Sequence, residues 1–280
     1  MVKKSFFSAE IVKTREGRQY HIGLAPGEVA PFIILSGDTE RVHKIASFFE
    51  EAGDPVCSRE YKTITGRYNG IPVSAMATGM GPDNTEIAIV ELSQIVKNPT
   101  FIRVGSSGAI KENIAIGDLV ISTASLRMEN TSLGFVWEGF PAFAHHEVIL
   151  SLITSASRLR ARFHTGITAT ASGFYGAQGR KTGLFNSISP DLLEKLNNMN
   201  VSNMEMETSV LFTLSALAGF RAGAVCAIYA QRHENKFIDS ETKEAAERNC
   251  IKVALGAIEI LNEMDRRKGK NKYWLPSMGI

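Results

Sequence analysis

The sequence predicts a single α/β domain of three layers, α/β/α, in which helices cover both faces of a central mixed β-sheet. Three observations support this fold class. Apolar, β-prone runs alternate with segments whose apolar residues have helical spacing, glycine-rich segments follow several of the apolar runs, and no linker or repeat divides the 280 residues. We therefore expect an N-terminal arm over residues 1–20, one domain over residues 21–265 and a C-terminal tail over residues 266–280.

The first strand and helix of the domain are predicted at residues 31–53. Residues 31–38, PFIILSGD, are an apolar run that ends in a glycine turn. Asp38 is a good N-cap, and the apolar residues after it have helical spacing and predict a helix that stops at Gly53. Backbone N–H groups at such a helix start attract anions, and Arg41 would add positive charge there. An ordinary capped helix without a ligand is the alternative.

A β-hairpin is predicted at residues 62–76. Residues 69–70, Asn-Gly, stand between its two β-prone runs and are typical of a tight hairpin turn. Residues 79–82 then turn into a helix, which ends at Asn98 because a proline follows.

Residues 100–110, TFIRVGSSGAI, predict a buried strand that ends in a loop of small residues. Gly105 and Gly108 permit unusual backbone angles and the close approach of a ligand. Ser106 adds a hydroxyl donor, and Arg103 adds a permanently charged guanidinium. This combination suits an anion such as phosphate. The alternative is a tight turn whose arginine pairs with a structural carboxylate.

The second half of the chain continues the alternation. Strands are expected at residues 117–124, 166–171 and 222–230, and helices at residues 149–159, 192–199 and 241–264. A glycine-rich segment after the second of these strands carries Phe174, Gln178 and Arg180. An aromatic ring, an amide and a guanidinium can stack on and hydrogen-bond a flat polar ring. A solvent-exposed loop is the alternative.

Residues 203–208, NMEMET, are expected to open an apolar helix that continues to Ala218. The carboxylates of Glu205 and Glu207 at the head of a buried helix need partners, because burying a carboxylate is costly. The alternative is that both carboxylates only favour the positive end of the helix dipole.

Charge and cysteine content exclude several classes of protein. The formal net charge of +2, with scattered lysines and arginines, gives no basic surface for nucleic acid. Three separated cysteines form neither a disulfide framework nor a metal-ligand spacing, which favours a reducing cytoplasm. No run reaches the roughly 18 apolar residues of a membrane helix, and residues 1–7 lack the apolar core of a secretory signal. The adjacent His145 and His146 have no third ligand at helical spacing, so we expect no metal site.

Several short motifs together resemble the nucleoside phosphorylase family, and within it the uridine phosphorylase branch, from about residue 21 to about residue 263. Each motif is weak alone, but their number and their order indicate membership. The motifs are residues 21–24, 37–41, 58–60, 103–108, 174–180 and 205–207, together with Arg232.

The resemblance implies a role for each matching residue. Inorganic phosphate would be bound by Gly37, Arg41, Arg103 and Ser106, and by Arg59 from a neighbouring subunit. The ribose would be bound by Met206 and Glu207, and by His21 from the neighbouring subunit. The base would be bound by Phe174, Gln178 and Arg180, with Arg232 ordering their loop. The residues expected to act directly in catalysis are Arg103, Glu207, Gln178 and Arg180.

The activity that the resemblance implies is the reversible phosphorolysis of uridine to uracil and ribose 1-phosphate, in pyrimidine salvage. Deoxyuridine and thymidine stay open as further substrates. Purine-specific relatives carry an aspartate after the strand that here ends at Ala230, and this chain has none there. Phosphate would be a co-substrate, and no cofactor is implied. A potassium site stays open, because Glu60 matches it while residues 81–84 depart from the usual turn.

The cross-subunit roles imply a homo-oligomer, at least a dimer, and leave open a hexamer arranged as a trimer of dimers. Three other functions are alternatives: a purine nucleoside phosphorylase, a hydrolytic nucleosidase of the same fold, and a nucleoside-binding protein without activity. Three arginines around one site repel each other unless an anion lies among them. Such crowding favours a phosphorylase over a hydrolase, in which water would replace the phosphate.

Overall fold

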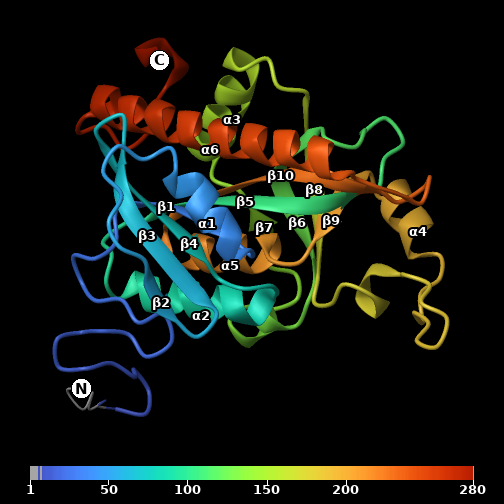
Figure 1. Cartoon of the computed structure of the whole chain (residues 1–280), viewed down its shortest axis with the longest axis horizontal. Coiled ribbons are helices and arrows are strands. Elements are labelled where there is room, and N and C mark those ends of the chain that lie inside the picture. Colours follow the sequence, from blue (N-terminus) through green and yellow to red (C-terminus); the bar gives the residue numbers. More distant parts are fainter. Residues whose placement is uncertain (1–5, 7, 280) are drawn as a thin grey trace.

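The predicted three-layer α/β/α architecture is confirmed by a computed structural model, which describes Phe6 and residues 8–279. A mixed sheet lies between two layers of helices (Figure 1). Its strands are β1 (Phe32–Ser36), β2 (Val56–Ser58), β3 (Tyr61–Tyr68), β4 (Ile71–Ala77), β5 (Thr100–Ala109), β6 (Leu119–Met128), β7 (Ala142–Phe143), β8 (Phe163–Ala171), β9 (Val201–Glu205), β10 (Arg221–Gln231) and β11 (Lys236–Phe237).

Helices pack on both faces of the sheet and enclose two apolar cores. One core lies between the sheet and α1, α3 and α6, and the other lies between the sheet and α2 and α5. The helices are α1 (Thr39–Ala46), α2 (Pro82–Ser93), α3 (His146–Arg158), α4 (Leu192–Asn198), α5 (Thr208–Ala218) and α6 (Ser240–Lys268), with short 3₁₀ turns at Thr131–Gly134, Gly176–Gln178 and Pro276–Met278. None of the described helices has the length and apolar content needed to cross a bilayer.

Five strands of the sheet close into a ring, which the sequence does not predict. Strand β10 pairs with both β5 and β6, β6 pairs with β8, β8 pairs with β9, and β9 pairs back onto β5. Strands β1, β4, β3 and β2 extend from β5 as an open sheet, while the two-residue strands β7 and β11 pair with β6 and β10. The ring brings the ends of β5, β9 and β10 together at one place, and the pocket described below lies there.

The hairpin is confirmed, but helix α1 is shorter than predicted. Asn69 and Gly70 both have positive φ, 48° and 71°, as a two-residue hairpin turn requires. The helix ends at Ala46 rather than Gly53, because the following backbone pairs with the hairpin. Gly53 donates its N–H to the Thr65 carbonyl, and the chain passes so close to Gly66 that a side chain there would collide with it.

The prediction that residues 105–108 form a loop is wrong. They continue strand β5, because β10 pairs with them from Gly105 opposite Cys226 to Gly108 opposite Ala230, with an irregularity at Tyr229. Small residues allow this close pairing inside the ring. The anion-binding residues of this run therefore lie on a strand within the sheet.

The prediction for residues 203–208 is also wrong in part. Residues 201–205 form β9, in which Met204 pairs with Gly108 of β5, and helix α5 begins only at Thr208. Glu205 ends the strand, and its carboxylate accepts hydrogen bonds from the N–H groups of Glu207 and Thr208. The Glu205 carboxylate therefore lies at the positive end of the helix dipole, as in the alternative explanation, but it also pairs with Arg103, so the dipole is not its only partner.

Two helix boundaries also differ from the expectation, and the C-terminal residues contact the domain. Helix α3 begins at His146 rather than residue 149, and α6 continues to Lys268. The tail returns to the domain, where Trp274 is buried and donates its N–H to the carboxylate of Glu147. The prediction about a secretory signal in residues 1–7 lies outside the described residues except for Phe6. The boundaries of the arm and the tail stay predictions.

Candidate active site

A cavity of about 460 Å³ lies where β1, β5, β9 and β10 end together. Sheet edges at the ends of parallel strands are the usual ligand sites of α/β proteins. The residues that line this cavity come mainly from the turn after β1, from β5, from the loop after β8, from the β9–α5 junction and from β10. The lining consists of Gly37, Asp38, Thr39, Arg41, Met80, Arg103, Ser106, Ser107, Gly108, Phe174, Gln178, Arg180, Met204, Glu205, Met206, Glu207, Tyr229, Ala230, Phe237 and Lys243.

One end of the cavity is cationic. Gly37, Arg41, Arg103 and Ser106 all line it, so the predicted convergence of these residues is confirmed. Arg41 is buried on α1, where its Nε donates to Glu247 at 2.5 Å and its Nη1 donates to the Val104 carbonyl at 3.2 Å. Asp38 caps this helix, as predicted, by accepting a hydrogen bond from the Glu40 N–H.

Arg103 is buried and holds two carboxylates. Its Nε donates to Glu205 at 2.9 Å and its Nη2 lies 2.5 Å from Glu207. Burial opposes its charge, but Glu207 and Glu205 keep the pKa of Arg103 above the usual value. The guanidinium folds back along its own strand beside Gly105, where an added Cβ would lie 2.8 Å from Nη2. Only glycine leaves this space.

The expectation that the arginines of this site lack a partner without a bound anion is wrong for Arg41 and Arg103. Arg41 pairs with Glu247, and Arg103 pairs with Glu205 and Glu207, so each guanidinium already has an anionic partner from this chain. These carboxylates neutralise the buried positive charge without a ligand. Arginine crowding alone does not distinguish a phosphorylase from a hydrolase.

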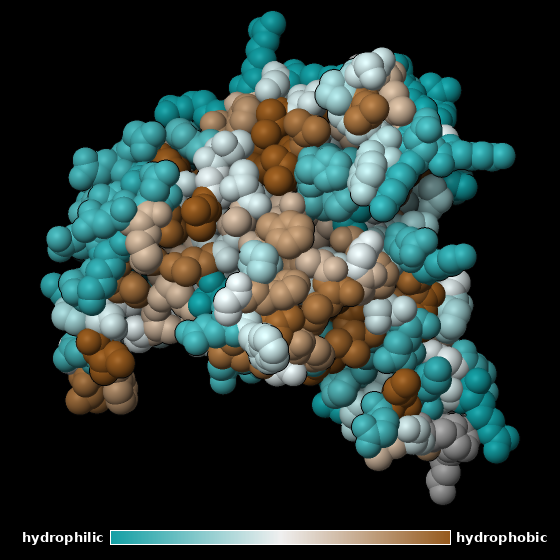
Figure 2. Space-filling view, turned by 180° about the vertical axis from the view of Figure 1, so that it is seen from behind, coloured by the Kyte–Doolittle hydropathy of each residue, from teal (hydrophilic) through white to brown (hydrophobic). Residues whose placement is uncertain are grey.

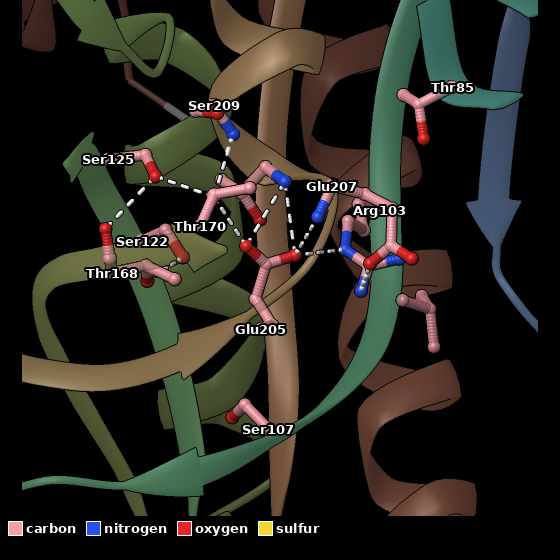
Figure 3. A network of polar contacts seen from close by, with 12 residues as sticks. Thr85, Arg103, Ser107, Ser122, Ser125, Thr168, Thr170, Glu205, Glu207 and Ser209 are labelled. Carbon is pink, nitrogen blue, oxygen red and sulfur yellow. Dashed lines mark hydrogen bonds and ion pairs between the residues drawn. The ribbon is translucent and has the colours of Figure 1, made fainter. Parts of the chain in front are cut away.

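A buried network of hydroxyl groups supports Glu205 from behind, and sequence reasoning missed it. Thr170 donates to Glu205 at 2.6 Å and shares a hydrogen bond with Ser125, which continues to Thr168 (Figure 3). Thr170 also accepts the N–H of Ser209. These residues come from β6, β8 and α5, and their scattered positions give no motif. Their effect is to fix the Glu205 carboxylate, and through it the plane of Arg103.

Glu207 lines the cavity and pairs with Arg103. Its Oε1 accepts the N–H of Gly81 at 2.7 Å, while its Oε2 faces Arg103. Burial raises the pKa of Glu207, with Glu205 adding to the rise and Arg103 opposing it. Met206 lines the cavity beside it.

The other end of the cavity is aromatic and amide-lined. Phe174, Gln178 and Arg180 all line it, on the loop that follows β8. The Arg180 guanidinium stacks 3.9 Å from the centre of the Phe174 ring, and its Nε donates to the Phe174 carbonyl at 2.9 Å. Arg232 is outside the lining, but its Nη2 donates to the Gln178 carbonyl at 3.0 Å. The predicted contact of Arg232 with this loop is therefore present.

His21 and Arg59 do not reach the cavity of their own chain. The Nδ1 of His21 lies 2.7 Å from Glu91 on α2, and Arg59 lies over the ring of Tyr20 at 4.7 Å. Their predicted roles require a second subunit and stay predictions.

Several lining residues were not expected to be functional. Tyr229 belongs to a run that reads only as a buried strand, yet its ring lines the cavity, and burial raises the pKa of its hydroxyl to about 12. The Nζ of Lys243 lies 5.8 Å from the centre of that ring. Lys243 sits in the first turns of α6, which the sequence marks only as a capped helix.

The cavity combines buried arginines with an aromatic ring and an amide, at one edge of a mixed sheet in which five strands close into a ring. The profile of the phosphorylase superfamily matches residues 31–260, and the chain belongs to this family. The predicted family membership is thereby confirmed.

Within this family, the chain is similar to several proteins named as uridine phosphorylases. The chain is 46% identical to a uridine phosphorylase of Thermococcus kodakarensis, over 99% of both chains. It is 33% identical to the uridine phosphorylase of Escherichia coli, over 85% of this chain and 96% of that one. Among solved structures, a Trypanosoma brucei nucleoside phosphorylase described as showing uridine phosphorylase activity superposes with a TM-score of 0.82, at 26% identity, over 89% of this chain and 99% of that one.

Proposed function

We propose that the protein is a uridine phosphorylase, a pentosyltransferase that converts uridine and phosphate reversibly into uracil and ribose 1-phosphate. Relatives that carry this name match nearly the whole chain. The single observation that carries the proposal is that one cavity is lined by Arg41 and Arg103, by Gln178 and Arg180, and by Glu207. The chemistry of these groups suits phosphate, base and sugar respectively.

The proposed reaction follows from this assignment of residues to phosphate, base and sugar. An oxygen of hydrogen phosphate attacks C1′ of the ribose, the bond from C1′ to N1 of uracil breaks, and the phosphate proton ends on the base. Positive charge grows on the sugar and negative charge on the leaving base. Arg41, Arg103 and Ser106 would hold the phosphate near C1′, while Gln178 and Arg180 would stabilise the charge on the base. Met206 would pack on the ribose, and Glu207 would accept hydrogen bonds from its hydroxyls.

The decisive experiment is uracil release from uridine with and without phosphate. We expect release to require phosphate, with ribose 1-phosphate formed in equal amount. Undiminished release in phosphate-free buffer would identify a hydrolytic nucleosidase. Inosine and guanosine serve as comparison substrates, since a guanosine phosphorylase of Halorubrum lacusprofundi is also 28% identical to this chain. Deoxyuridine and thymidine belong in the same panel.

We also propose that the active unit is a homo-oligomer, at least a dimer and in a larger form a hexamer, in which Arg59 completes the phosphate site and His21 reaches the ribose of a neighbour. Both residues lie away from the cavity of their own chain. The face seen from behind in Figure 2 carries apolar side chains over its centre. A second hollow, of about 730 Å³, is lined largely by apolar residues of the 131–141 segment, where the Trp137 side chain is 93% exposed. Exposed apolar area of this kind favours association.

Mixing two inactive variants tests the shared site. In a hybrid dimer of Arg59→Ala and Arg103→Ala chains, one site keeps both arginines. Random mixing should therefore recover about a quarter of wild-type activity, because half of the dimers are hybrids with one intact site. No recovery, with dimers shown to exchange, would place Arg59 outside the neighbouring site.

The remaining assignments follow from the same mechanism. The proposed reaction needs only positioned charges, so phosphate is the only further reactant and we propose no organic cofactor, while a potassium site stays open. Activity after dialysis against EDTA tests for a divalent metal, and activity with choline in place of potassium tests the potassium site. The three cysteines are unpaired and two of them are buried, which supports a reducing cytoplasmic setting.

A further inference from the structure

Two carboxylates share Arg103, and the structure holds them very differently. Glu205 accepts from four donors: Arg103, Thr170 and the N–H groups of Glu207 and Thr208. Glu207 is contacted by Arg103 and by the backbone N–H groups of Gly81 and Met206. Glu205 is thus fixed by a hydroxyl and two backbone N–H groups besides the arginine, whereas Glu207 has only backbone N–H groups besides the arginine. Glu207 is the carboxylate that can leave.

The proposed function gives Glu207 and Arg103 different substrates, yet here they bind each other. Arg103 would contact phosphate, and Glu207 would contact the ribose hydroxyls. A phosphate at the Nη2 edge of Arg103 would bring its oxygens against the Glu207 carboxylate. Two anions at hydrogen-bond distance in a buried site repel strongly. Phosphate and Glu207 therefore compete for the same edge of the guanidinium.

We propose that Glu207 exchanges partners: it neutralises Arg103 in the empty pocket and turns to the ribose hydroxyls when phosphate takes its place, so that phosphate and nucleoside bind cooperatively. This inference rests on the proposed function and assigns the coupling of its two substrates to one side chain. Phosphate removes the arginine from Glu207, and the ribose supplies new donors. Each substrate thereby lowers the cost of binding the other, and the coupling is reciprocal.

Burial strengthens the effect. The side chain of Glu207 is only 5% exposed, so water does not replace a lost partner. Burial already raises the pKa of this carboxyl, which shows how poorly the site tolerates its charge. A freed Glu207 needs either a proton or hydrogen-bond donors, and the two hydroxyls of a ribose are donors.

Calorimetric titration with uridine, with and without sulfate, tests the exchange in the intact protein. Sulfate is a tetrahedral dianion that stands in for phosphate without supporting turnover. We expect sulfate to tighten uridine binding about 5–50-fold, within the usual range of coupling between two sites. Uracil has no hydroxyls for Glu207, so its affinity should change less than about twofold on this reasoning. This comparison of two ligands needs no variant and is unaffected by misfolding.

Two charge-matched variants then assign the coupling to a residue. Glu207→Gln should bind sulfate more tightly, because an amide does not neutralise Arg103, and its uridine affinity should no longer respond to sulfate. Glu247→Gln is the matched control. It also removes a carboxylate from a phosphate-end arginine, Arg41, but Glu247 does not line the cavity. It should keep the sulfate effect on uridine.

The outcomes separate the inference from the function on which it rests. Coupling that persists in Glu207→Gln, or that is equal for uridine and uracil, would overturn the exchange while leaving a phosphorylase in place. Wild-type protein that binds uridine with no response to sulfate would also overturn it. Wild-type protein that binds neither uridine nor sulfate would overturn the proposed function itself.

Discussion

The anion end of the cavity lies largely on regular structure, strand β5 and helix α1, and the base end lies on a loop. Arg103 comes from β5 and pairs with Glu205, whose carboxylate is itself fixed by the buried hydroxyl of Thr170 (Figure 3). Phe174 and Arg180 come from the segment after β8, where the Phe174 side chain is 44% exposed and Arg180 contacts mainly Phe174. The same cavity thus joins a part that contributes to folding with a part that contributes chiefly to recognition. Substitutions at the anion end should therefore lower both stability and activity, whereas substitutions at the base end should lower activity alone.

The largest effect is expected for Arg103→Ala. The substitution removes the proposed phosphate ligand and leaves Glu205 and Glu207 buried without their cation. We expect kcat/KM for uridine to fall about 10³-fold or more, and the free energy of unfolding to fall by about 3–5 kcal/mol, as for other broken buried pairs. Steady-state kinetics and urea unfolding measure the two quantities. A variant of wild-type stability would show that the carboxylates do not depend on Arg103.

Arg180→Ala should lower activity nearly as far without the loss of stability. We expect kcat/KM for uridine to fall about 10²–10³-fold, since a donor to the leaving base is lost. The unfolding free energy should stay within about 0.5 kcal/mol, as for other partly exposed side chains. The same two assays apply. Full uridine activity in this variant would contradict the assignment of the base end.

Phe174→Ala sharpens the comparison within the base end. The ring offers a stacking face but no charge, so we expect mainly a higher KM for uridine, by about fivefold, equivalent to about 1 kcal/mol of aromatic contact. The KM for phosphate should be unchanged. Arg180 also loses its stacking partner, so a fall in kcat that equals the fall in Arg180→Ala would mean that the two side chains act as one unit.

The smallest expected effect is a change in the pH dependence of the protein's stability, caused by Glu247 at the anion end. Burial opposes ionisation of Glu247, but hydrogen bonds from Lys44 and Arg41 outweigh it and lower the pKa of Glu247 below its usual 4.5. A carboxyl with a lowered pKa in the folded state stabilises the fold above its unfolded pKa, and this contribution disappears as the pH falls through the folded pKa. Wild type should therefore lose stability below about pH 4.5 more steeply than Glu247→Gln, measured by urea midpoints between pH 3 and pH 7. Arg180→Ala should keep the wild-type slope.

The sequence predicts the parts of the site that depend on local pattern. The cap at Asp38 and the hairpin turn at residues 69–70 are each specified by a few neighbouring residues, and both are present. The convergence of Arg41 with Arg103 is implied by the family resemblance, and in the structure β1 and β5 lie side by side and bring the two residues to one cavity. The phosphorylase fold itself follows from the combined motifs.

The missed features depend on pairing between distant segments. Residues 105–108 read as a loop because they are small, but β10 holds them in a strand. Glu205 reads as the start of a helix, but β5 and β8 pair with its segment. The hydroxyl network contains Thr170 and Ser125, which are ordinary strand residues until β6 and β8 lie side by side. No local pattern encodes such contacts, since tertiary pairing decides them.

The missing side chain at Gly105 has a consequence for redesign of this enzyme. The guanidinium of Arg103 rests in the gap that this glycine leaves, so its location is set by the backbone of its own strand. Substitutions in the exposed loop after β8 could accommodate other nucleobases, while the phosphate bound by Arg103 would keep its position. A change in the position of the phosphate would instead require a different backbone path of β5.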